Sequence, residues 1–184
     1  MKIIIFGASG SGTTTLAKAL AKRMDFIHLD SDDYYWKITN PPFQEKIPLT
    51  ERNTRLTADF KKNEDVILSG SIVSWGKEWE TAFDVAIFIK LDNEERMRRL
   101  KQREEERYGD RLLFDDQLRK SSKAFLEWAR QYDNPNFGSR SIRLHKKWMQ
   151  LLSCKVIEID GATPLEIKIN KVIEEVNYLT GNHS

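Results

Sequence analysis

Cysteine is nearly absent from this chain, because Cys154 is the only one among its 184 residues. A single cysteine excludes an internal disulfide framework and a cysteine-rich zinc site. Long apolar runs are missing as well. None approaches the ~20 residues that a membrane-spanning helix needs, and the six residues before the first glycine are too few for the core of a signal peptide. We therefore expect a cytoplasmic protein that does not bind membranes.

An excess of charge of one sign is missing too. Thirty lysine and arginine residues face twenty-eight acidic ones, which leaves a formal charge of +2. This balance is too even to predict a nucleic-acid partner. Hydrophobic residues make up 40% of the chain, and its nine Phe, five Tyr and five Trp are spread along it, which argues against disorder. A chain of this length predicts a single domain, residues 1–184.

Five short apolar segments alternate with stretches that have helical spacing. Continuous runs of branched and aromatic residues are typical of strands buried on both faces. Their alternation with helices predicts an α/β fold with a five-stranded, parallel, doubly wound sheet. The expected strands are 3–6, 26–29, 66–68, 85–89 and 156–159, and the expected helices are 14–24, 50–60, 94–107, 112–131, 140–152 and 164–179, with mostly loop over 34–48.

A glycine-rich turn, residues 7–14, joins the first expected strand to the first expected helix. It reads GASGSGTT and matches the phosphate-binding (Walker A) pattern G-x-x-x-x-G-K-[ST] except at the lysine position, which is Thr13. The glycines let successive N–H groups turn inward over a helix N-terminus and bind anions. The expected phosphate-binding residues are Gly7, Ser9, Gly10, Ser11, Gly12, Thr13, Thr14 and Thr15, and the Thr14 hydroxyl is the expected ligand of Mg²⁺.

The missing loop lysine removes a charge from this expected site. Thr13 can donate one hydrogen bond, but it carries no point charge to place against the phosphates. Lys18 lies four residues beyond Thr14, on what we expect to be the solvated face of the helix. A replacement cation should therefore come from another part of the chain.

The loop and the sheet pattern, with the runs DDYYW (32–36) and SGS (69–71), resemble the small P-loop kinases. These are the adenylate and cytidylate kinase group, with the shikimate and gluconate kinases. The nearest likeness is to bacterial adenylate-kinase-like ATPases of unassigned substrate, and it spans nearly the whole chain. The resemblance implies a P-loop fold of the nucleoside-monophosphate kinase type with ATP and Mg²⁺ as cofactors. It also implies an acceptor-binding region at 30–62 and a helical lid at about 101–140.

Carboxylates follow the second expected strand at Asp30, Asp32 and Asp33. A carboxylate there can orient a water on Mg²⁺ or accept the proton of an attacking hydroxyl. In shikimate-type and gluconate-type kinases an Asp-x-Asp pair divides these tasks, so the resemblance implies a metal role for Asp30 and a catalytic role for Asp32. The alternative is that Ser31, Asp32 or Asp33 caps a following helical turn.

The third expected strand ends in Ser69-Gly70, where nucleoside-monophosphate kinases place Asp-Gly. A serine can hydrogen-bond a water on the metal, but it adds no negative charge. The negative charge around the metal would then come from Asp30 and Asp32. This departure argues against a standard adenylate kinase.

Arginines recur every three or four residues after the fourth expected strand, at Arg96, Arg99, Arg103 and Arg107, so they share one helical stripe. Neighbouring glutamates could neutralise them on a solvated helix. The resemblance places the lid here, and lid arginines stabilise the charge on the transferring phosphoryl group. It therefore implies catalytic roles for Arg103 and Arg107, with Arg111 behind them, and these arginines could replace the missing lysine.

Two aromatic clusters have alternative interpretations. The first is either an acceptor pocket that stacks on a planar base or a small core beneath a proline-rich loop. The second cluster is basic as well as aromatic, and its two interpretations are packing within the protein and contact with the acceptor. The first consists of Tyr34, Tyr35, Trp36 and Phe43, and the second of Arg140, Arg143, His145 and Trp148.

The leading hypothesis is an ATP-dependent kinase, a monomer or homodimer, that transfers the γ-phosphoryl group to a nucleotide, a nucleoside or another small-molecule acceptor. The alternative is an ATP-binding regulatory module with little or no phosphotransfer, which the changes at Thr13 and Ser69 favour. Binding to nucleic acid through the arginine-rich segment is disfavoured by the acidic residues within it.

Overall fold

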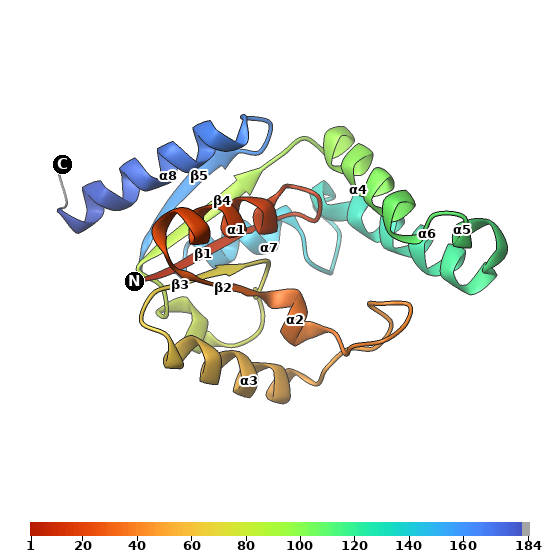
Figure 1. Ribbon diagram of the computed structural model, residues 1–184, viewed down its shortest axis with the longest axis horizontal. Helices are drawn as coiled ribbons and strands as arrows, with labels where there is room; N and C mark the ends of the chain where they lie inside the picture. The colour runs from red at the N-terminus through yellow and green to blue at the C-terminus, as the bar shows by residue number, and fades with distance from the viewer. Residues whose placement is uncertain (182–184) are drawn as a thin grey trace.

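The computed structural model describes residues 1–181 and has five parallel strands in the order β2-β3-β1-β4-β5 (Figure 1). Each expected strand is present, with ends that differ by at most one residue. The predicted α/β fold with a five-stranded parallel sheet is therefore confirmed. The strands are β1 (Lys2–Gly7), β2 (Ile27–Asp30), β3 (Val66–Ser69), β4 (Val85–Lys90) and β5 (Lys155–Asp160).

The α-helices follow the expected alternation with two differences, and the 3-10 helices η1 and η2 were not expected. A short helix opens the expected loop 34–48, because the Asp30 side chain accepts the Asp32 N–H and caps it. The expected helix 112–131 is split at Asp115, which is extended and caps the second part through the Leu118 N–H. The helices are α1 (Thr13–Met24), α2 (Ser31–Tyr35), α3 (Leu49–Lys62), η1 (Lys77–Glu80), α4 (Asn93–Tyr108), α5 (Arg111–Phe114), α6 (Asp116–Arg130), η2 (Gln131–Asp133), α7 (Ile142–Met149) and α8 (Leu165–Thr180).

The central strand β1 supplies the core of both faces of the sheet because its side chains alternate. Ile3 and Ile5 pack with buried residues of α1 and α8, while Ile4 and Phe6 pack with residues of α3 and with Trp148 of α7. All four β1 side chains are fully buried. The glycine-rich loop that follows β1 is thus anchored at the centre of the sheet, where ligands of doubly wound folds bind.

Helices α4, α5 and α6 form an arm that projects beyond the carboxyl ends of the strands (Figure 1). Met97 and Leu100 of α4 pack against Ala129 of α6. At the base of the arm, the fully buried Arg96 pairs with Asp133 and donates a 3.1 Å hydrogen bond to the Leu91 carbonyl. Arg96 therefore fixes the arm to the end of β4.

Candidate active site

The glycine-rich loop turns from β1 into α1 through two left-handed residues. Gly10 has φ 82° and Gly12 has φ 96°, a region that side chains disfavour. A Cβ on Gly7 would lie 2.6 Å from the Ile89 carbonyl oxygen, so no larger residue fits there. The fully buried Ser11 Oγ has no hydrogen-bond partner in the part of the chain that the structure describes. Such a loop fits a polyphosphate that would accept from its free donors.

Thr14 and Asp30 meet directly at the carboxyl edge of the sheet. The Thr14 hydroxyl donates a 2.9 Å hydrogen bond to Asp30 Oδ2, and Asp30 Oδ1 accepts the Asp32 N–H at 3.1 Å. Residues 1–181 contain no group of three or more His, Cys, Asp or Glu side chains arranged to hold a metal ion. Mg²⁺ is usually held by one or two protein oxygens together with phosphates and waters, so the Thr14–Asp30 pair fits that mode of binding.

Asp32 lies in a mixed electrostatic environment. Its side chain is exposed, but the protein atoms around it desolvate the carboxyl group and raise its pKa, and the charge of Asp30 raises it further. The positive charges of Arg140 and Arg103 oppose this shift. The structure therefore brings Asp32 within electrostatic range of Arg103, from the arm, and of Arg140, which sequence reasoning left without a role.

The two predicted lid arginines differ in their contacts. Arg107 pairs with the buried Glu104 at 3.2 Å and lies over the Phe43 ring at 4.7 Å. Arg103 forms no ion pair within residues 1–181, and desolvation together with the charge of Arg107 lowers the pKa of its guanidinium. Arg111 lies 3.8 Å from Asp115. Of the three, Arg103 alone is free of a carboxylate partner.

Arg99 approaches the loop that lacks a lysine. Its Nη1 lies 4.0 Å from the position that a Gly12 Cβ would take, and it also donates at 3.5 Å to the Gly161 carbonyl, which follows β5. Arg99 is paired with Glu95 at 2.7 Å. Lys18, by contrast, has an exposed side chain, as expected.

Ser69 ends β3 without an exposed hydroxyl. It is fully buried, and its Oγ lies 2.9 Å from His28 Nε2. Burial lowers the pKa of the half-buried His28. Because the Ser69 hydroxyl is engaged within the protein, Asp30 and Asp32 remain the candidates for supplying negative charge to a metal at this edge of the sheet.

The first aromatic cluster is packed against itself. Tyr34 is buried and its hydroxyl donates to Asp59 Oδ2 at 2.7 Å. The ring centroids of Tyr35 and Trp36 are 4.8 Å apart, and those of Trp36 and Phe43 are 5.9 Å apart. These contacts favour the small-core interpretation over an open stacking pocket.

The second cluster separates into three environments. His145 is fully buried, with Nε2 2.8 Å from Ser71 Oγ and Nδ1 2.6 Å from the Tyr132 hydroxyl. Trp148 is also buried and packs edge-on against Phe6. Arg143 is exposed, whereas Arg140 acts on Asp32 and lies over the Trp128 ring at 5.0 Å.

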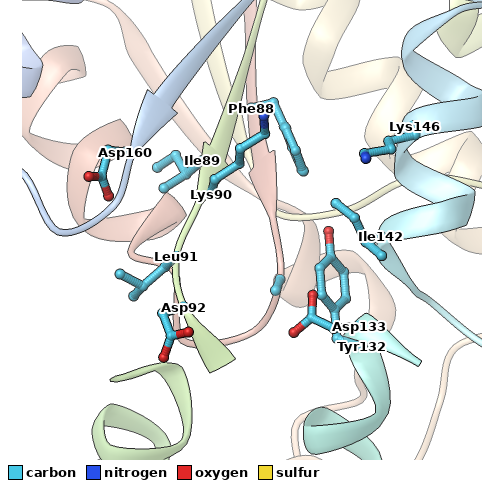
Figure 2. Close-up of a pocket in the computed structure, with 11 residues that line it drawn as sticks. Phe88, Ile89, Lys90, Leu91, Asp92, Tyr132, Asp133, Ile142, Lys146 and Asp160 are labelled. Atoms are coloured by element: carbon cyan, nitrogen blue, oxygen red, sulfur yellow. The ribbon is translucent and has the colours of Figure 1, made fainter. Parts of the chain in front are cut away.

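A separate pocket of about 330 Å³ borders the end of β4 and Ala8 of the loop. Figure 2 shows Leu91 and Asp92 on one side of it and Tyr132 and Asp133 on the other. Its carboxylates are already engaged. Asp92 caps α4, Asp133 pairs with Arg96, and Asp160 accepts the Ala162 N–H at 2.8 Å. The pocket therefore adjoins the phosphate loop without offering a free acid.

The five-stranded parallel sheet and the glycine-rich loop at the end of β1 form the fold of the small P-loop kinases, which confirms the resemblance seen in the sequence. Residues 3–124 match the AAA domain family, and the chain belongs to that family. The uncharacterized protein YqaC of Bacillus subtilis is 40% identical over 180 residues, which cover 98% of each chain.

Two further similarities connect the chain to kinases. A cytidylate kinase of Methanococcus vannielii is 29% identical over 117 residues, or 58% of this chain and 67% of that protein. The structure of shikimate kinase from Acinetobacter baumannii in complex with shikimate has a TM-score of 0.56 at 15% identity, covering 95% of this chain and 92% of that one. Within residues 1–181, no helix is long and apolar enough to cross a membrane.

Proposed function

We propose that this protein is an ATP-dependent kinase that transfers the γ-phosphoryl group of ATP to a small-molecule acceptor. The observation that carries this proposal is the position of Asp32. It lies two residues after Asp30, which is bonded to Thr14 of the loop, and it is within range of the unpaired Arg103. A phosphate loop, a magnesium-type oxygen pair, a carboxylate and an arginine on the arm are the parts that phosphoryl transfer requires.

Each part has an assigned task. The N–H groups and hydroxyls of residues 7–15 hold the phosphates, and Thr14 and Asp30 hold Mg²⁺, which neutralises phosphate charge when bound. Asp32 accepts the proton of the acceptor hydroxyl as the hydroxyl oxygen bonds to the γ-phosphorus and the bond from phosphorus to the ADP oxygen breaks. Arg103 stabilises the charge on the transferring group, and Arg107 joins it once it leaves Glu104 and Phe43.

The acceptor is best supported as an alcohol. A hydroxyl must lose its proton as it is phosphorylated, whereas an acceptor phosphate is already ionised at neutral pH and needs no base. Asp32 is a base without function if the acceptor is a phosphate. This favours a hydroxyl-bearing acceptor over a nucleoside monophosphate.

The test is the initial rate of ADP formation from Mg·ATP with neutral nucleosides, nucleoside monophosphates, polyols and hydroxy acids as acceptors. We expect acceptor-dependent turnover that falls about 10³-fold in Arg103→Ala, in the range of arginines that contact a transferring phosphoryl group. Arg130→Ala is the matched control, since Arg130 also lies on the arm without an ion pair among residues 1–181. Equal losses in both variants would contradict the role of Arg103.

A second candidate function is an ATP-binding regulatory module with little or no turnover. Thr13 and the engaged, uncharged Ser69 favour it, because two charges common in kinases of this class are missing. Binding of Mg·ATP by calorimetry, with no ADP formed from any acceptor class, would select this function over the kinase.

A further inference from the structure

The outward face of α8 borders a groove that the proposed kinase site does not use. Strand β5 is the last strand at one edge of the sheet, and α8 lies beside it at the end of the molecule away from the arm (Figure 1). The inward face of α8 is apolar, with Ile169, Val172 and Val176 buried in the core. The opposite face lines a groove of about 810 Å³. The lining residues of α8 are Ile167, Asn170, Lys171, Glu174, Glu175 and Tyr178.

Four of these residues form one seam along the helix. Ile167, Lys171, Glu174 and Tyr178 are spaced by four, three and four residues, which is the spacing along which two helices pack in a coiled coil. The seam is about 16 Å long, since a helix rises 1.5 Å per residue. Ile167 is 56% exposed and Tyr178 68%, although Lys155 Nζ lies 5.8 Å from the Tyr178 ring centroid. The seam therefore has an exposed apolar side chain at each end and two opposite charges in the middle.

The two charges in the middle of the seam are not used within the protein. Lys171 and Glu174 are both exposed, and neither forms an ion pair in the part of the chain that the structure describes, residues 1–181. The other charged side chains of α8 are engaged, in the contacts Glu166–Arg23, Lys168–Gly161 and Glu175–Lys155. Lys171 and Glu174 are thus the charges of this helix that a partner can pair.

We propose that α8 packs antiparallel against α8 of a second copy of this chain, about a two-fold axis that crosses the helices between residues 172 and 173. Ile167 then faces the partner's Tyr178, and Lys171 faces the partner's Glu174. The two-fold axis repeats each contact, as in any isologous interface. The dimer therefore has two ion pairs at its centre and an apolar contact at each end. This interface is independent of the proposed kinase activity.

The charge pattern selects the antiparallel direction. In a parallel pair Lys171 would face the partner's Lys171, and Glu174 would face the partner's Glu174. Like charges at facing positions are destabilising, and this excludes the parallel alternative. The seam is self-complementary in the antiparallel direction alone, which is why a second copy of the chain is the partner that fits it.

The dimer is expected to be weak. A contact along one seam of about three turns is smaller than a standard protein interface, and ion pairs near the surface add little affinity. We expect a dissociation constant of about 10–100 μM at low salt. Salt screens the central ion pairs, so the dimer should weaken as the ionic strength rises.

The experiment is sedimentation equilibrium of the full chain at low salt, at concentrations from about one-tenth of the expected dissociation constant to ten times it. We expect the mass to rise from 21.5 kDa toward twice that value. Glu174→Lys and Lys171→Glu each place like charges together at the axis. Each variant alone should raise the dissociation constant by about 10-fold or more. Both residues are exposed, so the melting temperatures should not change.

Mixing the two variants gives the sharpest test. An equimolar mixture of Lys171→Glu and Glu174→Lys restores opposite charges at both facing positions, so the two variants should form a mixed dimer with about the affinity of wild type. Glu166→Lys is the matched control, because it makes the same charge change on α8 outside the seam. It should dimerise as wild type does.

Three results would overturn the inference. The first is a wild-type protein that stays monomeric over the whole concentration range. The second is a dimer that neither charge reversal weakens, which would place the interface elsewhere on the molecule. The third is a mixture of the two variants that stays monomeric although wild type dimerises. None of these results bears on ADP formation, so the proposed function is tested separately.

Discussion

The Thr14 hydroxyl lies 2.9 Å from Asp30 Oδ2, and this one hydrogen bond joins the phosphate loop to the acidic segment after β2. The other oxygen of the same carboxylate caps α2 through the Asp32 N–H. Asp30 therefore fixes the start of α2, and with it the position of Asp32, relative to the loop. The proposed metal ligand and the proposed base are held as one preorganised unit, which lowers the cost of arranging them during phosphoryl transfer.

The first prediction concerns the charge of Asp30. Asparagine caps helices about as well as aspartate, so Asp30→Asn should fold normally but lose the anionic oxygen offered to Mg²⁺. We expect a fall of at least about 10²-fold in turnover and a higher Mg²⁺ requirement, measured by titrating Mg²⁺ at fixed ATP. Asp115→Asn makes the same change at the cap of α6. A similar loss of turnover in both variants would mean that the effect comes from helix capping rather than from metal binding.

The second prediction is a pH dependence set by Asp32. Desolvation by the surrounding protein atoms and the charge of Asp30 raise the pKa of Asp32. The carboxyl group therefore stays protonated, and unable to accept a proton, to a higher pH than an ordinary aspartate. The value of kcat/KM should therefore rise with pH through that raised pKa. In Asp32→Asn this limb should disappear, with a rate about 10²-fold to 10⁴-fold lower.

Asp33→Asn is the control for that profile. The pKa of Asp33 is also raised, by desolvation and by the charge of Asp30, but no task in the proposed reaction is assigned to Asp33. Its variant should keep the acid limb of the pH profile. If Asp33→Asn removes the limb and Asp32→Asn does not, the two aspartates exchange roles.

The third prediction restores the loop lysine. Thr13→Lys adds a point charge at the position where P-loop proteins place one against the β- and γ-phosphates. We expect Mg·ATP to bind about 10-fold to 100-fold more tightly, measured by calorimetry, because an added charge-assisted contact contributes roughly 1.5–3 kcal/mol. Thr13→Met is the control for side-chain length. Unchanged affinity in Thr13→Lys would indicate that Arg99 or Arg103 already fills that position.

Local patterns predicted the sheet because the strands are short apolar segments, continuous in β1, β3 and β4, and most of them are followed by a stretch with helical spacing. The phosphate loop was predictable for the same reason, since all of its residues are adjacent in the chain. The position of the Arg52 guanidinium against the rings of Tyr35 and Trp75 was not predictable, because these residues lie 17 positions before Arg52 and 23 positions after it. Only the fold brings these three side chains together.

The basic segment near residue 140 shows the same limit. Arg140, Arg143 and His145 are close in sequence and alike in charge type, yet one faces Asp32, one is exposed and one is fully buried. Ser141 caps α7, so Arg140 lies in the loop before the helix, whereas Arg143 and His145 lie on an exposed and a buried face of the helix. Composition alone could not assign these side chains to their environments.

The last prediction concerns His145, which is the centre of a buried hydrogen-bond network. Burial, with a smaller contribution from the charge of Arg140, lowers its pKa to about 3. The ordinary value in an unfolded chain is near 6.5. As the pH falls below about 6.5, His145 takes up a proton in the unfolded chain but stays neutral in the folded protein. The free energy of unfolding should then fall by up to about 1.4 kcal/mol per pH unit from this residue alone.

His145→Gln removes that titration and tests the predicted direction of the change in stability with pH. At pH 7 the variant should be less stable than wild type by about 1–3 kcal/mol, because glutamine cannot hydrogen-bond both Ser71 and Tyr132 in the geometry of the imidazole. This loss of stability should lower the melting temperature by about 2–4 °C per kcal/mol. Between pH 7 and pH 4 the difference from wild type should shrink, since only wild type loses the histidine contribution. Tyr132→Phe removes one hydrogen bond to Nδ1 and keeps the histidine, so its deficit should not shrink in this way. Denaturant unfolding at both pH values measures all three proteins. A constant gap between wild type and His145→Gln would show that the imidazole takes up its proton over the same pH range in the folded protein as in the unfolded chain.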